Sequence, residues 1–159
     1  MKKQKDKKKI CLISSSGGHF EQLLMLRKLG EDYNIFIVTE KTKYNKTDEK
    51  INYYVMQVNR KEFLFVFKMI CILFKSLFIY LKEKPDVIIS TGVLASIPML
   101  FIGHLFKRKV IYIESFAKIN SPTMTGKLIY KKHIADQFYV QWESMLKFYP
   151  DAIYKGGIY

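Results

Sequence analysis

A short segment rich in serine and glycine, ending in a histidine, is the part of the chain best suited to bind an anion. It runs from Ser14 to His19 (SSSGGH) and lies between an apolar run and a stretch with helical periodicity. Glycines at a strand-to-helix turn let the backbone approach a ligand, and the N–H groups at a helix N-terminus attract phosphate. We therefore predict that Ser16, Gly17 and Gly18 contact a phosphate group. Because the segment matches neither the Walker sequence nor a complete GxGxxG, a tight turn with Ser16 or His19 capping the helix is the alternative.

His19 is the first candidate for a catalytic residue. An imidazole titrates near neutral pH, so a histidine at a ligand-facing turn can take a proton from a reacting hydroxyl. Most lone histidines do no chemistry, which leaves a purely structural His19 as the alternative.

Two further segments carry side chains that could serve the same site. Ser90-Thr91-Gly92 follows another apolar run, in the same arrangement as the first segment. Glu114 and Ser115 follow a third run, and a carboxylate at the carboxyl end of a parallel strand is a candidate catalytic group. The alternative for Glu114 is a helix cap or an ion pair, for example with Lys118.

The residue types favour chemistry without a metal ion. The sequence has no Asp-x-Asp pair to hold a metal–diphosphate and no His/Cys cluster to bind zinc. Cys11 and Cys71 lie sixty positions apart, both inside apolar runs. This pattern predicts two buried thiols in a reducing compartment rather than a disulfide.

Alternating β-rich runs and longer helical patterns predict an α/β fold with a parallel sheet flanked by helices. The expected strands are Ile10–Ser14, Asn34–Thr39, Asn52–Val58, Val87–Ser90, Lys109–Ile113 and Gln137–Val140. The expected helices are His19–Leu29, Glu62–Glu83, Val93–Phe106, Thr125–His133 and Ser144–Phe148. Since crossovers between parallel strands are right-handed, the loops after the first, fourth and fifth strands should form one functional edge.

Composition predicts one globular domain with an anionic counterpart. Hydrophobic residues make up 49% of the 159 residues, which excludes a disordered chain. The formal net charge of +13 is compatible with nucleic acid, acidic lipid or a phosphorylated substrate. Six lysines within residues 1–9 predict a flexible basic tail ahead of a domain over residues 10–159. The apolar run Ile10–Ile13 is too short for a signal peptide, so we expect the protein on the cytoplasmic side.

The basic residues do not favour nucleic acid as the partner. Their segments lack the exposed interleaved aromatics and the recognisable modules of nucleic-acid binders. Arg60, beside Lys61, is a candidate phosphate contact after the third expected strand; a solvated basic pair is the alternative.

The segment Glu62–Leu81 is predicted to be an amphipathic helix that contacts a membrane surface. Sixteen of its twenty residues are apolar, yet Lys68 and Lys75 interrupt it. With Lys61 and Lys82 they recur every seven residues and fall on one helical stripe. Aromatic residues entering the headgroup region, Phe63, Phe67 and Phe74 among them, would complement lysines facing anionic lipid. A sheet-covering helix with a solvated lysine face is the alternative.

A second apolar stretch, Val87–Phe106, is predicted to be a strand followed by a helix and not a membrane span. Ser90-Thr91-Gly92 interrupts it, and the remaining helix is shorter than a span requires. Its basic end at Lys107 and Arg108 could lie near a membrane surface.

Four ordered motifs carry a resemblance to a known family. They are SSSGGH, PDVIISTG (Pro85–Gly92), IYIESFAKINSPTMTGKLIY (Ile111–Tyr130) and the segment Ala135–Tyr159. With these motifs the chain resembles the Alg-fourteen-like oligosaccharide biosynthesis family, the acceptor-side subunits of two-component GlcNAc transferases, and in particular its bacterial capsular and exopolysaccharide members.

This resemblance implies the N-terminal, acceptor-binding half of a GT-B glycosyltransferase, similar to the GlcNAc transferase that forms peptidoglycan lipid II. It implies that Gly17, Gly18 and His19 lie by the acceptor diphosphate, that Ser90, Thr91 and Gly92 form a second loop there, and that Glu114 and Ser115 face the cleft. The UDP-sugar would be bound mainly by a separate catalytic subunit, with no other cofactor. Gly156, Gly157, Ile158 and Tyr159 would dock that partner.

The expected function is therefore that of a membrane-associated subunit of an inverting glycosyltransferase. It would bind a polyprenyl-diphosphate-linked saccharide at the cytoplasmic face of the membrane and would be inactive alone. Eukaryotic members of the family open with a transmembrane anchor, whereas this chain opens with MKKQKDKKK. A stand-alone nucleotide-binding module and a basic adaptor without chemistry are the alternatives.

Overall fold

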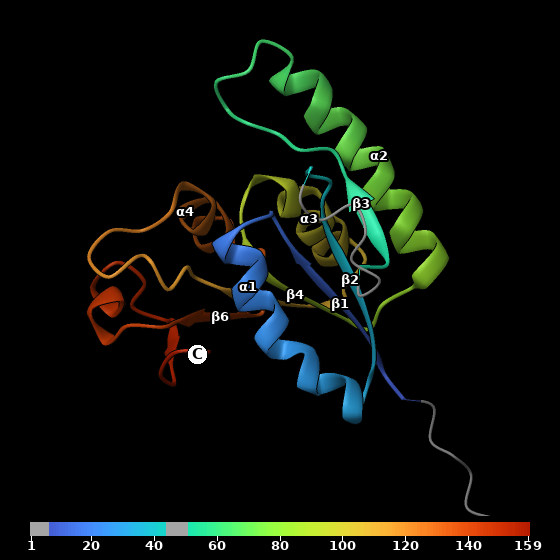
Figure 1. Cartoon of the computed structure of the whole chain (residues 1–159). Coiled ribbons are helices and arrows are strands. Elements are labelled where there is room, and N and C mark those ends of the chain that lie inside the picture. The colour runs from blue at the N-terminus through green and yellow to red at the C-terminus, as the bar shows by residue number, and fades with distance from the viewer. Residues whose placement is uncertain (1–6, 44–50) are drawn as a thin grey trace, which may run out of the picture.

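Seven parallel strands form one sheet in the computed structural model, which describes residues 7–43 and 51–159 (Figure 1). The strand order is β3-β2-β1-β4-β5-β6-β7. The strands are β1 (Lys9–Ser14), β2 (Asn34–Glu40), β3 (Tyr53–Val55), β4 (Val87–Gly92), β5 (Lys109–Ile113), β6 (Gln137–Val140) and β7 (Ile153–Tyr154). This is the Rossmann-like architecture that the sequence predicted.

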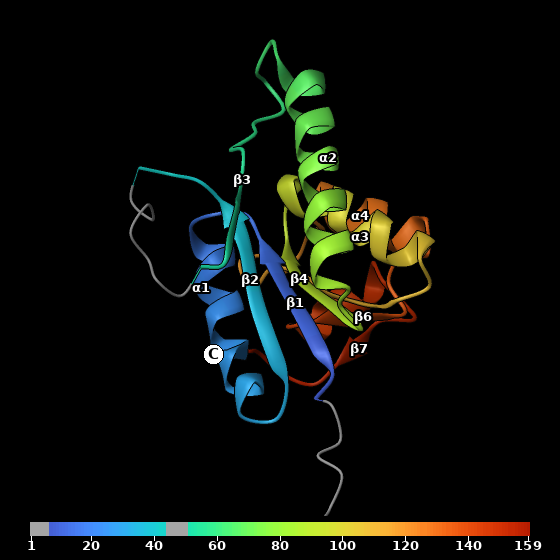
Figure 2. The ribbon, with the colours of Figure 1, turned by 90° about the vertical axis from the view of Figure 1, so that its right-hand side faces the viewer.

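The helices cover both faces of the sheet, which explains why the central strands are almost continuously apolar. The α-helices are α1 (Gly18–Met25), α2 (Phe65–Glu83), α3 (Ile97–Leu105) and α4 (Met124–Lys131). The 3-10 helices are η1 (Leu26–Glu31), η2 (Leu94–Ser96) and η3 (Glu143–Lys147). Figure 2 shows α2, α3 and α4 on one face and α1 on the other.

Alternate residues of β1 contribute to two separate cores. Cys11 and Ile13 pack in the larger core under α2, α3 and α4, whereas Ile10 and Leu12 pack in the smaller core under α1. Period-two alternation along a strand sends successive side chains to opposite faces. The sheet is therefore buried on both sides.

Most differences from the prediction lie after β3 and near the C-terminus. The expected strand Asn52–Val58 is reduced to Tyr53–Val55, and α2 begins at Phe65 instead of Glu62. Asn59 is the cause, because its side-chain oxygen accepts from the Lys61 N–H and its carbonyl from the Glu62 N–H, which forms a turn ahead of the helix.

Several expected helices are divided into an α-helix and a 3-10 helix, or form a 3-10 helix instead. The strand β7 was not predicted. The range 19–29 contains α1 and part of η1, the range 93–106 contains η2 and α3, and the range 144–148 lies mostly in η3. The stretch Val87–Phe106 is a strand followed by helices, as predicted. No helix within residues 7–43 and 51–159 combines the length and apolarity needed to cross a membrane.

The predictions for the N-terminus and for one cysteine need correction. Lys9 belongs to β1 and its ammonium pairs with Glu83 at 3.0 Å, so it is not part of a flexible tail; residues 1–6 of that expected tail lie outside the described residues. Cys11 is fully buried, and this burial raises the pKa of its thiol. Cys71 is only half-buried.

Candidate functional site

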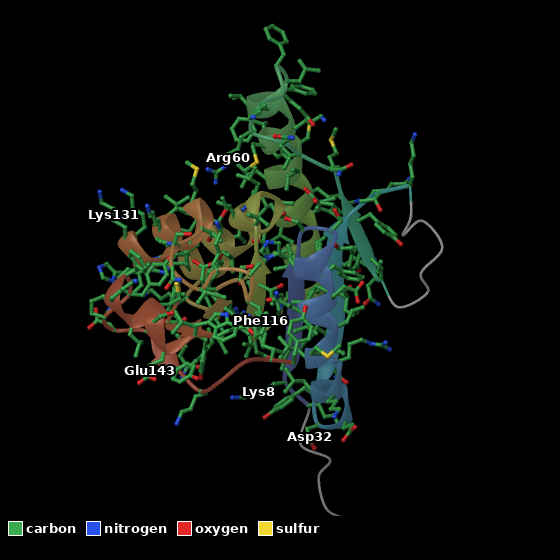
Figure 3. All side chains as sticks on the ribbon, turned by 60° about the vertical axis from the view of Figure 1, so that its left-hand side comes forward. Lys8, Asp32, Arg60, Phe116, Lys131 and Glu143 are labelled. Atoms are coloured by element: carbon green, nitrogen blue, oxygen red, sulfur yellow. The ribbon has the colours of Figure 1, made fainter. Side chains whose placement is uncertain are left out.

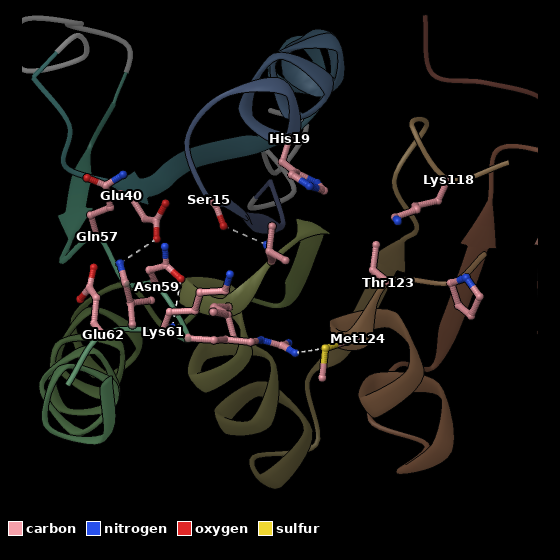
Figure 4. A pocket seen from close by; sticks show the side chains of 15 residues that line it. Ser15, His19, Glu40, Gln57, Asn59, Lys61, Glu62, Lys118, Thr123 and Met124 are labelled. Atoms are coloured by element: carbon pink, nitrogen blue, oxygen red, sulfur yellow. Dashed lines mark hydrogen bonds between the residues drawn. The ribbon is translucent and has the colours of Figure 1, made fainter. Parts of the chain in front are cut away.

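A pocket of about 800 Å³ lies at the carboxyl ends of the strands (Figure 4). The residues that line it come from the ends of five strands and the loops that follow them. They are Ser15, His19, Glu40, Gln57, Val58, Asn59, Arg60, Lys61, Glu62, Val93, Leu94, Lys118, Pro122, Thr123 and Met124.

The pocket lies where the strand order reverses. β1 pairs with β2 on one side and with β4 on the other, so the loops after β1 and β4 diverge to opposite faces. Ligands of open α/β sheets bind in the crevice at this switch point. The prediction that the loops after β1, β4 and β5 share one edge is confirmed, because Ser15, Val93 and Lys118 line the same pocket.

The His19 side chain is held in one orientation by Thr91. Its Nδ1 lies 2.7 Å from the Thr91 carbonyl oxygen, and the Thr91 hydroxyl donates to the His19 carbonyl at 2.7 Å. A carbonyl only accepts hydrogen bonds, so Nδ1 carries a proton. The proton acceptor of the neutral ring is then Nε2, and His19 lines the pocket. This tautomer is the one a general base in the pocket requires.

The second predicted loop positions His19 through the hydrogen bonds of Thr91. Ser90 and Thr91 are fully buried, and the Ser90 hydroxyl accepts from the Gly92 N–H at 3.0 Å. Gly92 has a φ of +95°, which favours glycine, and an added Cβ would lie 3.6 Å from Nδ1 of His19. None of the three lines the pocket, and their contact with the diphosphate stays a prediction.

The first loop is partly tied down by Glu40. Ser16 donates through both its N–H and its hydroxyl to the Glu40 carboxylate at 3.2 Å, so its side chain is already engaged within the protein. Gly17 adopts a φ of +76°, and a Cβ added at Gly17 or Gly18 would meet nothing within 4 Å. The backbone at the start of α1 is thus open to a ligand, as predicted for these two glycines, while Ser16 serves to fix the loop.

Glu114 is buried next to the pocket, where it bonds to the pocket-lining Thr123, and its predicted place at a cleft stays a prediction. It is 1% exposed, and its carboxylate accepts from the Ser115 N–H at 2.8 Å, the Thr123 hydroxyl at 2.9 Å and the Tyr149 hydroxyl at 2.7 Å. The Thr123 hydroxyl in turn accepts from the Gly126 N–H and caps α4. The Glu114 carboxylate thus supports the residue that caps α4.

Ser115 is also buried and does not line the pocket, and its contact with the acceptor stays a prediction. Its neighbour Lys118, considered only as an ion-pair partner of Glu114, instead lines the pocket. The Glu114 cluster holds the ends of the loop that presents Lys118.

The pocket contains three cationic side chains from two separate segments. Arg60 and Lys61 precede α2, and Lys118 follows β5. Figure 4 shows Lys118 and His19 coming from different segments toward the same space, and Figure 3 shows Arg60 beside α2. The Arg60 guanidinium contacts the Met124 sulfur of α4 and so closes one side of the pocket. Arg60 was predicted as a phosphate contact, whereas Lys118, inside the motif Ile111–Tyr130, was considered only as a partner of Glu114.

The acidic residues of the pocket are engaged by neighbours. The Glu40 carboxylate accepts from Ser16 and from the Val58 N–H at 3.2 Å, and Glu62 pairs with Lys68. The positive charge of Arg60, Lys61 and Lys118 is thus available to an anion. Within the described residues, no group of three or more His, Cys, Asp or Glu side chains could hold a metal ion.

The outer surface of α2 is apolar and largely exposed, as predicted for a membrane contact. Phe63 is fully exposed, and Phe67 and Phe74 are 61% and 66% exposed. Lys68 pairs with Glu62, and Lys75 lies over the Phe78 ring, with 5.8 Å between its Nζ and the ring centroid. The start of α2 projects beyond the rest of the domain (Figures 1 and 2).

The basic residues after α3 lie near the other end of α2. Lys107 is exposed, whereas Arg108 donates to the Tyr80 hydroxyl at 3.0 Å and lies 3.9 Å from Asp86. Arg108 is therefore engaged in contacts within the domain. Leu105 and Phe106 are also exposed, and the Phe106 ring stacks on Tyr80 of α2 with centroids 4.8 Å apart.

The C-terminal segment folds back onto the domain. The Ile158 N–H donates to the Gln141 side chain at 3.0 Å, and the Tyr159 ring packs edge-on against Phe116 with centroids 5.1 Å apart. Gly157 also lies against Phe116, and Gly156 has a φ of +89°. This segment, predicted to dock a partner, is thus ordered against the residues that follow β5 and β6.

These features define an α/β domain of the GT-B type. MurG of Acinetobacter baumannii has the same fold, with a TM-score of 0.68 and 17% identity over 86% of this chain and 42% of that one. The UDP-bound MnaA of S. aureus superimposes with a TM-score of 0.71 and 12% identity over 95% of this chain and 44% of that one. The chain thus spans less than half the length of these proteins.

The sequence profile described as "Oligosaccharide biosynthesis protein Alg14 like" matches residues 10–158, and the chain belongs to that family. The UDP-N-acetylglucosamine transferase subunit ALG14 of Homo sapiens is 26% identical over 94% of this chain and 82% of its own length. The corresponding subunit of Candida albicans is 38% identical over 48% of this chain and 36% of its own length.

Proposed function

We propose that this chain is the acceptor-binding subunit of a two-component, inverting glycosyltransferase at a membrane surface. It binds a polyprenyl-diphosphate-linked saccharide and recruits a separate subunit that binds the UDP-sugar, in the assembly of a bacterial capsular or exopolysaccharide repeat unit. Membership in a family whose curated relatives are named transferase subunits supports this proposal.

One observation carries the proposal: the cationic side chains and His19 share one pocket. A diphosphate carries its charge on oxygens that accept hydrogen bonds, which suits Arg60, Lys61 and Lys118. The open backbone of Gly17 and Gly18 at the start of α1 adds N–H groups and the positive end of the helix dipole. The acceptor saccharide then extends from the diphosphate toward His19.

In this arrangement His19 is the general base. Its Nε2 takes the proton of the acceptor hydroxyl while the oxygen attacks the anomeric carbon of the donor, and the UDP leaves into the site of the partner subunit. Thr91 holds Nδ1–H throughout, so protonation of Nε2 requires no rearrangement of the ring. The competing mechanism gives this chain only acceptor binding and partner activation, with the base elsewhere.

Attachment to the membrane rests on α2. Its exposed phenylalanines enter the headgroup region of the cytoplasmic leaflet, and the flanking lysines meet anionic lipid. This places the pocket, into which Arg60 projects just before α2, close to the lipid from which the acceptor comes.

Charge removal at Arg60 and Lys61 tests the diphosphate assignment. We expect the double variant Arg60→Ala/Lys61→Ala to raise the KM for the lipid-linked acceptor roughly 10- to 100-fold, because one or two charge-assisted hydrogen bonds are lost. The KM for the UDP-sugar should stay within about twofold, since the partner binds the donor. The measurement is steady-state kinetics of the reconstituted complex in detergent.

The matched control removes two charges away from the pocket. Lys131→Ala/Lys132→Ala changes exposed residues at the end of α4. An equal rise of the acceptor KM in both double variants would mean that net charge acts, and not a diphosphate site at Arg60 and Lys61.

A further inference from the structure

A second cavity, of about 770 Å³, lies between α2, α3 and α4, beside the polar pocket. Val66, Ile70 and Leu73 of α2 line it together with Phe101 of α3, and Arg60 is the one charged residue among the described residues of its lining. Figure 2 shows these helices on the same face of the sheet. We call this cavity the apolar groove.

The apolar groove exposes side chains that packing within the domain leaves uncovered. Val66 is 67% exposed, Ile70 46% and Leu73 43%. Its volume falls within the range of roughly 300–1,000 Å³ typical of sites for small organic ligands. A contiguous apolar surface of this kind marks a site that another apolar group covers.

The apolar groove adjoins the polar pocket. Arg60 and Leu94 line both cavities, so the two meet at these residues. A ligand that spans the junction has an anionic part beside Arg60 and an apolar part running along α2.

We propose that the apolar groove binds the first isoprene units of the acceptor's polyprenyl chain. The proposal rests on the proposed function, since it assigns the lipid part of the acceptor whose diphosphate lies in the polar pocket. In this way the acceptor is lifted partly out of the bilayer, and the protein holds both its diphosphate and the first part of its lipid chain. Phe67 and Phe74, which point outward from α2, contact the bilayer and not the polyprenyl chain.

Binding of soluble diphosphates to the full chain tests the proposal without vesicles or partner. The probes are inorganic diphosphate, dimethylallyl diphosphate and farnesyl diphosphate, measured by calorimetry below the concentration at which farnesyl diphosphate forms micelles. Each methylene that leaves water strengthens binding by at most about fourfold. We expect farnesyl diphosphate to bind about 100-fold more tightly than inorganic diphosphate, with dimethylallyl diphosphate between them.

Substitutions at two neighbouring residues distinguish binding in the apolar groove from binding at the outer face of α2. Leu73→Trp fills the groove and should lower farnesyl diphosphate affinity at least tenfold while inorganic diphosphate binds as before. Phe74→Trp, on an adjacent residue that does not line the groove, should change neither affinity. Equal affinities for all three probes, or equal effects of the two substitutions, would overturn the groove assignment. Failure of every diphosphate to bind would instead refute the diphosphate site of the proposed function, and the groove assignment with it.

Discussion

Replacing His19 with alanine is expected to lower turnover of the reconstituted transferase by about 10²- to 10⁴-fold, the usual contribution of a general base. The acceptor KM should change little, because the proposed function assigns the diphosphate to Arg60, Lys61 and Lys118. The expectation rests on geometry: Nδ1 is committed to the Thr91 carbonyl at 2.7 Å, and His19 lines the pocket with Nε2 as the remaining acceptor. The measurement is kcat at saturating acceptor and donor.

A matched histidine and an assembly assay complete this test. His104→Ala removes an exposed imidazole of α3 that does not line the polar pocket, and it should leave kcat unchanged. Co-purification of the partner subunit with the His19→Ala variant shows that assembly is intact. Unchanged turnover of an assembled His19→Ala complex would remove His19 from the chemistry and favour a base elsewhere.

Replacing Glu114 with alanine is expected to lower the free energy of unfolding by about 3–5 kcal/mol, as when one partner of a buried network is deleted. The hydroxyls of Thr123 and Tyr149 would lose their acceptor in a site that is 1% exposed. Burial first, and then the Glu114 carboxylate, raises the pKa of Tyr149, so this phenol remains a neutral donor. Chemical denaturation measures the effect.

A double-mutant cycle identifies the cause. Tyr149→Phe should destabilise less than Glu114→Ala, and the two effects should be non-additive because they share one hydrogen bond. Glu143→Ala, at an exposed position in η3, should change stability by no more than about 0.5 kcal/mol. Wild-type stability of Glu114→Ala combined with lost transfer would show that Glu114 acts in catalysis and not as a structural residue.

The arrangement of the sheet could be predicted because its central strands carry their signal locally. Ile10–Ser14 and Lys109–Ile113 are short, apolar and flanked by helical patterns, and the handedness of crossovers then orders them. β7 could not be predicted, since Ile153 and Tyr154 form a strand only by pairing with Tyr139 and Val140. A strand of two residues has no periodicity of its own.

The candidate site was predictable to the level of loops, but not to the level of side chains. His19 and Arg60 were identified because their loops follow strands, and both line the pocket. The burial of Glu114 was not predicted, because it depends on Tyr149, 35 positions away, which no local pattern reports. Lys118 was missed as a ligand contact because the fold of its loop is set by that same buried carboxylate.

The most direct test of the account is sugar transfer by the purified chain with and without the partner subunit. Labelled UDP-N-acetylglucosamine, other labelled UDP-sugars and a polyprenyl-diphosphate-linked saccharide are the substrates. The account predicts that the chain alone binds the acceptor but transfers no sugar, and that transfer begins when the partner is added. Transfer by the chain alone, or tight binding of UDP-sugar with no binding of the acceptor, would contradict it.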